Sequence, residues 1–342
     1  MNMEQEDKII IHFKCSPRAL PGLFNQGSFH HQDTRIIFFC FFKVKLVMLF
    51  LFILTTIFLN AQSRPIQKLA PGVFYYFGDE LQKKSANCLW VVFQDYVLAV
   101  DANYPWGAEE IIREIRKTTD KPVRFVFNTH YHHDHTWGNS VFVDSGAVVV
   151  ASMVTTSEMQ TLGQFEWDRR SAYSGGDMNP YRREFPTLTF EHRMIFDDGT
   201  HRVELIRMGP AHTAGDAVAW LPKEKILATG DLCVNGNPWG NNVADKNADY
   251  DRWLKVLDTL ASWGAETVIP GHGDPGSSEI LRQQREYLAD MLAQVRQGIK
   301  VGKSKEDLIK EIDLSRHPVR GGNTVSNHRS IRAMIDKLTG LW

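Results

Sequence analysis

Short apolar runs with the composition of β-strands alternate with longer amphipathic segments along most of the chain. Strands are predicted for β-branched and aromatic runs at residues 73–77, 89–93, 96–100 and 123–127. A helix is expected at 108–118, with glutamates in its first turn and basic residues in its last. A second helix is expected at 249–263, where large apolar residues share one face before Gly264. This alternation predicts an α/β fold.

Four of the strand-like runs end directly before a side chain of a type that binds metal ions. The run 123–127 leads into the sequence HxHxDH, which contains His130, His132, Asp134 and His135. The runs 203–208, 225–230 and 266–271 lead to His212, Asp231 and His272. Glycine and proline at the ends of these runs allow sharp turns. Four strand ends could therefore converge on one place.

The HxHxDH sequence offers four ligands in one short loop, which can serve two adjacent metal ions. Extended backbone alternates its side chains, so His130 and His132 can point the same way, whereas Asp134 and His135 follow after a change of direction. Imidazole nitrogens and carboxylate oxygens are ligands for Zn²⁺ or a similar borderline metal. His133 occupies the variable position of the motif and is not expected to bind metal.

Four separated motifs resemble those of the metallo-β-lactamase superfamily, in the same order. They are HxHxDH, AHTAGD at 211–216, ATGD at 228–231 and PGHG at 270–273. The resemblance spans about 70–276 and implies an αβ/βα sandwich of two facing mixed sheets, with the metals at one edge. It also implies two zinc ions, with iron or manganese as alternatives. One ion would be held by His130, His132 and His212, the second by Asp134, His135 and His272, and Asp231 would bridge them.

Within this superfamily the flanking segments and the ligands point to different relatives. Residues 220–227 and 240–245 resemble lactamases of the subclass with a cysteine ligand. However, Asp231 takes the place of that cysteine, and Val234 takes the place of the basic residue that holds the drug's carboxylate. His135 and Asp231 instead match glyoxalase II-like and lactonase-like hydrolases.

The resemblance implies a hydrolase that attacks an ester, thioester, lactone or amide-type bond of a small molecule with a metal-bridging hydroxide. Two alternatives remain open. One is a β-lactamase, and the other is a mononuclear iron sulfur dioxygenase, which would use only part of the ligand set.

Two residues are candidates for catalytic roles beside the metals. Asp134 could orient the attacking water or relay its proton. Asn242 stands where lactamases place an oxyanion-stabilising asparagine, although an asparagine after glycine, here Gly240, is also a good turn residue and that interpretation is favoured. Thr213 and Asp216 could fix histidine tautomers. Cys233 is expected to be a small buried residue and not a ligand.

Composition and net charge disfavour nucleic acid as a partner. With 43% hydrophobic and 23% charged residues and a net charge of −1, the chain can bury a core and has no basic bias towards nucleic acid.

The N-terminal 61 residues are expected to be a pre-sequence outside the fold. Lys43 and Lys45 precede an apolar run at 46–59, and Asn60-Ala61-Gln62 offers a cleavage site. This pattern predicts export to the periplasm or the medium. The membrane would be met only through this signal, or through an uncleaved anchor that includes 36–42. Removal at Ala61 would leave Cys88 and Cys233, which permit one disulfide without implying it.

The catalytic domain is expected at 62–276, followed by a helical C-terminal extension at 277–342. Helices are predicted at 278–300, 305–312 and 330–338. This extension could bind substrate, cap the core or form an oligomer contact. The polar and aromatic stretch 154–181, which includes Phe165, Trp167, Tyr173 and Tyr181, is expected to be a flap over the site or a packed surface excursion.

Overall fold

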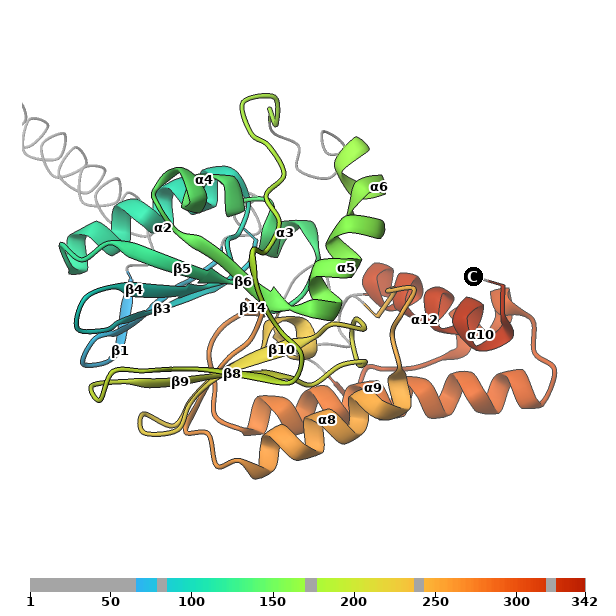
Figure 1. Cartoon of the computed structure of the whole chain (residues 1–342). Helices are drawn as coiled ribbons and strands as arrows, with labels where there is room; N and C mark the ends of the chain where they lie inside the picture. Colours follow the sequence, from blue (N-terminus) through green and yellow to red (C-terminus); the bar gives the residue numbers. More distant parts are fainter. Residues whose placement is uncertain (1–65, 79–84, 170–176, 237–242, 318–323, 342) are drawn as a thin grey trace, which may run out of the picture. The chain divides into compact units, whose positions relative to one another are not determined.

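The computed structural model divides the chain into two compact units, 1–63 and 64–342, and describes residues of the second unit (Figure 1). The described residues are 66–78, 85–169, 177–236, 243–317 and 324–341. The expected pre-sequence 1–61 and its apolar run 46–59 lie outside them. Within these ranges, no helix has both the length and the hydrophobicity required to cross a bilayer.

The first sheet is built from the N-terminal half of this unit. Its strands, in both sequence and spatial order, are β1 (Gln67–Ala70), β2 (Val73–Tyr76), β3 (Cys88–Val92), β4 (Val97–Val100), β5 (Val123–Phe127), β6 (Val148–Ser152) and β7 (Leu188–Phe190). Strands β1 to β4 pair antiparallel, whereas β4 to β7 pair parallel. The sheet is therefore mixed, and the chain leaves β5 at the same edge as it leaves β4.

The second sheet has the spatial order β13-β11-β10-β9-β8. Its strands are β8 (Arg193–Asp197), β9 (Arg202–Arg207), β10 (Ala217–Leu221), β11 (Ile226–Ala228) and β13 (Thr267–Ile269). Two short strands, β12 (Val234–Asn235) and β14 (His272–Gly273), pair parallel to each other. This pairing places the segment after Asp231 beside His272.

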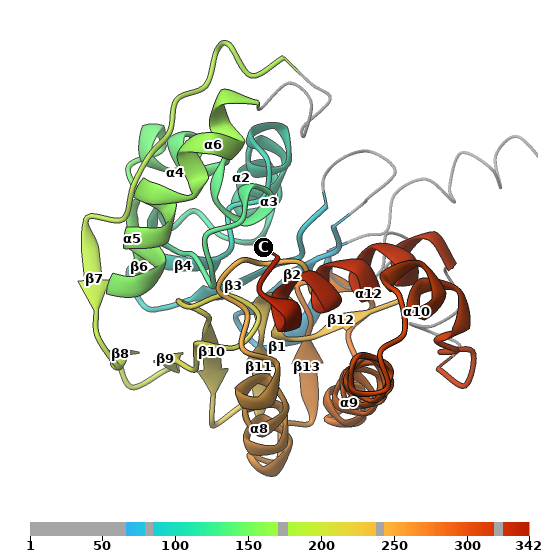
Figure 2. The ribbon, with the colours of Figure 1, turned by 90° about the vertical axis from the view of Figure 1, so that its right-hand side faces the viewer.

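Helices cover the outer faces of the two sheets, and an apolar layer fills the space between them. Leu89 and Phe127 of the first sheet share one buried cluster with Leu205 and Ala219 of the second. Helices α2 (Pro105–Thr118) and α4 (Asn139–Asp144) pack on the first sheet, and α8 (Tyr250–Ser262) and α9 (Glu279–Lys300) on the second (Figures 1 and 2). The predicted αβ/βα sandwich of two facing mixed sheets is confirmed.

Helix α2 differs from the prediction at its start. It begins three residues earlier than expected, at Pro105, because the fixed φ of proline suits the first helical position. Glu109 and Glu110 consequently lie beyond the first turn, and the expectation that they occupy it was wrong. The basic residues Arg116 and Lys117 are in the last turn, as predicted.

The stretch 154–181 is largely helical in its described part. Helices α5 (Met153–Thr161) and α6 (Gly163–Asp168) follow β6, and α5 begins at Ser152, whose hydroxyl accepts a hydrogen bond from the Thr155 N–H. Phe165 is more than half exposed, whereas Met178 is buried with Tyr104 and Trp137. Tyr173 lies outside the described residues.

The C-terminal helices pack into the main core. Helices α9, α10 (Lys305–Glu311) and α12 (Thr324–Thr339) supply buried apolar residues to the same cluster as α8 and β13. Leu288 of α9, for example, is fully buried there, together with Leu257 of α8 and Val268 of β13. The extension thus continues the helical layer that covers the second sheet.

Candidate metal centre

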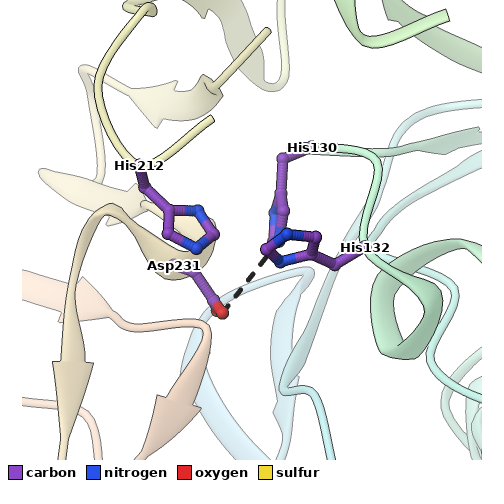
Figure 3. A group of neighbouring side chains, drawn as sticks. All are labelled: His130, His132, His212 and Asp231. Carbon is purple, nitrogen blue, oxygen red and sulfur yellow. Dashed lines mark ion pairs between the residues drawn. The ribbon is translucent and has the colours of Figure 1, made fainter. Parts of the chain in front are cut away.

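The seven predicted ligands gather into two groups at one edge of the sandwich. His130, His132, His212 and Asp231 form the first group, in which potential ligand atoms all lie within 4.8 Å of one another (Figure 3). Asp134, His135 and His272 form the second group, within the same limit. The seven side chains follow the ends of β5, β9, β11 and β13, with Asp134 and His135 in α3 (His133–Thr136) and His272 at the start of β14. The four strand ends converge as the sequence predicts.

The carboxylate of Asp231 faces both groups. Its Oδ1 lies 3.2 Å from Nε2 of His135 and 3.3 Å from Nε2 of His272, whereas its Oδ2 lies 4.0 Å from Nε2 of His130. Ligands of a tetrahedral zinc ion at about 2.0–2.1 Å are separated by about 3.3 Å. The spacing around Oδ1 therefore fits one ion, and the opposite oxygen is directed to the other group.

Several buried ring nitrogens in the first group make no hydrogen bond within the part of the chain that the structure describes. Nε2 of His130 and both ring nitrogens of His212 are buried and have no hydrogen-bond partner among the described residues. A buried polar atom without a partner costs about 1–3 kcal/mol, which a metal ion would offset. The donor set of imidazoles and carboxylates suits zinc or a similar divalent ion. The residues thus fit the metals that the sequence predicts.

Hydrogen bonds to the far side of two rings determine which nitrogen faces the centre. Nδ1 of His135 lies 2.8 Å from Oδ2 of Asp101, and Nδ1 of His272 lies 3.0 Å from the carbonyl oxygen of Ser85. These contacts leave the two Nε2 atoms facing each other at 3.4 Å. Such outer partners fix the tautomer of a metal-binding histidine.

His132 is oriented in the opposite sense. Its Nε2 lies 3.2 Å from Oδ2 of Asp245, which also accepts a 2.6 Å hydrogen bond from the hydroxyl of Tyr131. Burial lowers the pKa of His132, but the hydrogen bond and negative charge of Asp245 outweigh it and raise the pKa to about 9. These two donors in turn outweigh the burial of Asp245 and hold the pKa of its carboxyl down, at about 2.

Ser85 contacts two members of the second group, Asp134 and His272. Its hydroxyl donates a 2.7 Å hydrogen bond to Oδ2 of Asp134, and that same oxygen lies 3.2 Å from Nε2 of His272. Oδ1 of Asp134 lies 3.5 Å from Nδ1 of His133. Ser85 therefore fixes the positions of the Asp134 and His272 side chains relative to each other.

Close backbone approach explains two glycines of the motifs. A Cβ on Gly271 would lie 2.0 Å from Oδ1 of Asp231, and a Cβ on Gly230 would lie 2.3 Å from Oγ1 of Thr129. Gly230 also has a positive φ of 52°. A side chain at 271 would therefore collide with Asp231, and one at 230 would collide with Thr129.

The other residues considered for the site are Thr213, Asp216, Cys233 and Asn242. Thr213 and Asp216 meet through hydrogen bonds, and Oδ1 of Asp216 lies 3.4 Å from Nδ1 of His212. Cys233 is buried, with its Sγ directed to the carbonyl oxygen of Ile280 at 3.5 Å, and it belongs to neither ligand group. Asn242 lies outside the described residues.

Sequence reasoning missed three outer partners. Asp101 directly follows β4 and has a positive φ of 64°. In the sequence, only its place as a polar residue after a strand-like run could have indicated a role in the site. Asp245 belongs to the lactamase-like segment 240–245, in which no pattern indicates a contact with His132. Ser85 carries no local signal, because its two contacts come from residues 49 and 187 positions away.

Cys88 and Cys233 are both buried, and no disulfide joins them. The disulfide that the cysteine count permits is therefore not present.

Comparison with known proteins identifies relatives of two kinds. Residues 82–272 match the model of the metallo-beta-lactamase superfamily. The chain is 27% identical, over 247 residues, to a linear primary-alkylsulfatase of a Pseudomonas strain, covering 61% of this chain and 46% of that protein. It is 26% identical to a metallo-beta-lactamase type 2 of Elizabethkingia meningoseptica, covering 60% of this chain and 81% of the relative. The chain thus spans less than half the length of the alkylsulfatase.

Solved structures show the same fold. A stereoselective inverting sec-alkylsulfatase, Pisa1 from Pseudomonas sp., superposes with a TM-score of 0.63 at 17% identity, over 81% of this chain and 50% of that one. The DIM-1 metallo-beta-lactamase superposes with a TM-score of 0.52 at 23% identity, over 66% of this chain and 96% of that one. At these identities the likeness extends to the fold alone.

Proposed function

Since this chain belongs to the metallo-beta-lactamase superfamily, we propose that it is a hydrolase with a two-metal centre, with zinc in both positions. The observation that carries the proposal is the carboxylate of Asp231. One oxygen lies 3.2 Å from His135 of the second group, and the other is directed to His130 of the first at 4.0 Å. A carboxylate between two separate sets of histidines suits a bridging ligand. A site for a single ion would leave one set without a role.

When bound, a pair of divalent ions supplies Lewis acidity and lowers the pKa of water towards about 7. The contribution of the chain is to hold the ligands in fixed orientations and to limit the access of water. His130, His135 and His212 are fully buried, and Asp231 is 6% exposed. Charge that develops during hydrolysis therefore meets fixed groups in a partly dry site.

Asp134 is the candidate for moving a proton. Its Oδ2 faces His272 and Ser85, while its Oδ1 lies 3.5 Å from Nδ1 of His133. The His133 side chain is 21% exposed, more than that of Asp134 at 12%. We infer that a proton taken up at Oδ1 of Asp134 passes towards solvent by way of His133, whose side chain is the more exposed of the two.

The substrate we propose is a small molecule with an ester, thioester, lactone or amide-type bond. The relatives extend this range to sulfate esters, because one is an alkylsulfatase. β-Lactams are a second candidate, supported by the type 2 metallo-beta-lactamase relative. Val234, in place of a basic residue that would hold the drug's carboxylate, disfavours them.

A panel of substrates tests the proposal. Purified protein would be analysed for metal content and assayed with a carboxylic ester, a thioester, a lactone, a primary alkyl sulfate and a β-lactam. Two zinc ions per chain with turnover of one of the first four supports it. Turnover of the β-lactam alone makes the protein a lactamase. One iron ion per chain with oxygen consumption indicates the dioxygenase alternative and overturns the proposal.

We also propose that the protein acts in the periplasm or outside the cell, on the strength of the apolar run at 46–59 and the cleavage site at Ala61. Cell fractionation with N-terminal sequencing of the mature chain tests this. A chain that stays in the cytoplasm would contradict it.

A further inference from the structure

Helix α5 and its N-cap residue, Ser152, bind the backbone of the loop that carries His212 at Ala214 and Gly215. The hydroxyls of Ser152 and Thr155 donate hydrogen bonds to the carbonyl oxygen of Gly215, at 3.0 and 2.8 Å. The carboxylate of Glu158 accepts from the N–H of Gly215 at 2.9 Å and from that of Ala214 at 3.1 Å. A Cβ on Gly215 would lie 2.5 Å from the backbone nitrogen of Thr155, so glycine permits this approach.

The same carboxylate reaches a second loop, far away in the sequence. The amide of Asn247 donates a 2.9 Å hydrogen bond to Oε1 of Glu158, 89 positions away. The backbone N–H of Asn247 in turn donates a 2.7 Å hydrogen bond to Oδ1 of Asp245. The other oxygen of Asp245 contacts Nε2 of His132. Glu158 therefore joins the loop of His212 to the residue that orients His132.

Packing alone does not explain a carboxyl at this position. Glu158 is 4% exposed, and its burial raises its pKa to about 7. A buried carboxyl costs stability unless donors compensate for the lost water. The three donors here belong to the two loops that carry or orient His212 and His132, which are both in the first metal group.

We propose that Glu158 is a positioning residue for the first metal site: it sets the distance between His212 and His132 by binding both loops at once. This inference rests on the proposed two-metal centre. The second group has separate supports, because Asp101 orients His135, and Ser85 holds Asp134 and His272. A change at Glu158 should therefore act on the two sites unequally.

The test is metal binding by full-length Glu158→Gln. An amide of the same size keeps the shape but presents an NH₂ group where the carboxylate accepts from a backbone N–H. Zinc affinity would be measured by competition with a chelator, and site occupancy from the absorption bands of the cobalt-loaded protein. We expect a loss of about 10–100-fold in affinity at the three-histidine site and little change at the second site. Gln160→Ala, an exposed change on the same helix, serves as the control.

A second variant separates positioning from folding. Asn247→Ala removes one bond of Glu158 and leaves its two backbone bonds, so it should give a smaller loss at the same site. The losses should be non-additive in the double variant, since both changes break one connection. Thermal unfolding of the metal-free variants measures any general loss of stability.

Three results would overturn the proposal: unchanged zinc affinity in both variants, equal loss at both sites, or additive losses in the double variant. If wild-type protein binds no second ion, the proposed two-metal function fails first. If wild-type protein binds two ions and Glu158→Gln binds them equally well, the positioning role alone fails.

Discussion

Asp231 and His135 meet across the two metal groups, with Oδ1 of the carboxylate 3.2 Å from Nε2 of the ring. The two residues come from different sheets, since His135 follows β5 and Asp231 follows β11. Their contact therefore depends on the closure of the whole sandwich. It also places the one carboxylate shared by both groups at the point where the sheets meet.

Asp231→Asn should remove the shared anionic ligand while keeping its shape. We expect metal content to fall from about two ions per chain towards one, and turnover to fall by more than about 100-fold, beyond the loss typical of an outer partner. Metal analysis by mass spectrometry, alongside the most active substrate of the panel, measures both. Asp258→Asn, an exposed carboxylate on α8, is the matched control. Full metal content in Asp231→Asn would contradict a bridging role.

Ser85→Ala should weaken the second site selectively. The change removes the 2.7 Å hydrogen bond to Asp134 but keeps the backbone carbonyl that accepts from His272. Loss of one outer partner is expected to lower affinity for the second ion by about tenfold. Chelator competition gives this value, and Ser157→Ala on the exposed side of α5 provides the comparison. An equal loss at both sites would argue against this role for Ser85.

Metal binding should release protons at neutral pH. Burial lowers the pKa of His135, but Asp101, Asp231 and Asp134 outweigh it and raise the pKa to about 10. The pKa of His132 is raised to about 9, so both rings are in the positively charged, doubly protonated form in the metal-free protein at pH 7.5. A metal ion requires the neutral ring, so zinc affinity should rise with pH until both rings have lost their protons. Calorimetry in buffers of different ionisation enthalpy should show about two protons released, and release of none would contradict this prediction.

The same two groups set a pH dependence for the metal-free fold. Their pKa values are raised above the ordinary value of 6.5, so the protonated rings stabilise the folded state. This contribution is fully present below pH 6.5 and is lost as the pH rises through about 9 and 10.

Leu288→Ala tests whether the C-terminal extension belongs to the core. Leu288 is fully buried on α9 in the cluster that includes α8 and the second sheet. Truncation of a fully buried leucine costs about 2–5 kcal/mol, and denaturant unfolding of the whole chain measures this loss. The exposed Gln297→Ala on the same helix should cost less than about 0.5 kcal/mol. A loss this small for Leu288→Ala would show that α9 contributes little to the core.

The sequence predicted those parts of the structure that depend on local pattern. Strand β5 begins and ends at the predicted residues 123 and 127, because its β-branched and aromatic run is bounded by a turn and by the HxHxDH motif. The seven candidate ligands could be predicted because the motifs that carry them follow such runs and together resemble those of the metallo-β-lactamase superfamily. The start of α2 was not predicted correctly, because the helical spacing of apolar residues does not show at which residue the first turn begins.

The outer partners were not predictable in this way. His132 and Asp245 are 113 positions apart, and their contact exists only once both sheets are assembled. Glu158 lay in a stretch that was expected to be a flap or a surface excursion, and nothing in its neighbours marks a buried carboxyl. Contacts of this kind follow from tertiary structure, and single-sequence patterns do not report them.

The central claim is a pair of metal ions joined by Asp231, and anomalous scattering at the zinc edge from a crystal of the zinc-loaded protein tests it most directly. The account predicts two peaks about 3.5–4 Å apart, one beside His130, His132 and His212 and the other beside Asp134, His135 and His272, with Asp231 contacting both. A single peak, or two peaks of which only one contacts Asp231, would contradict it.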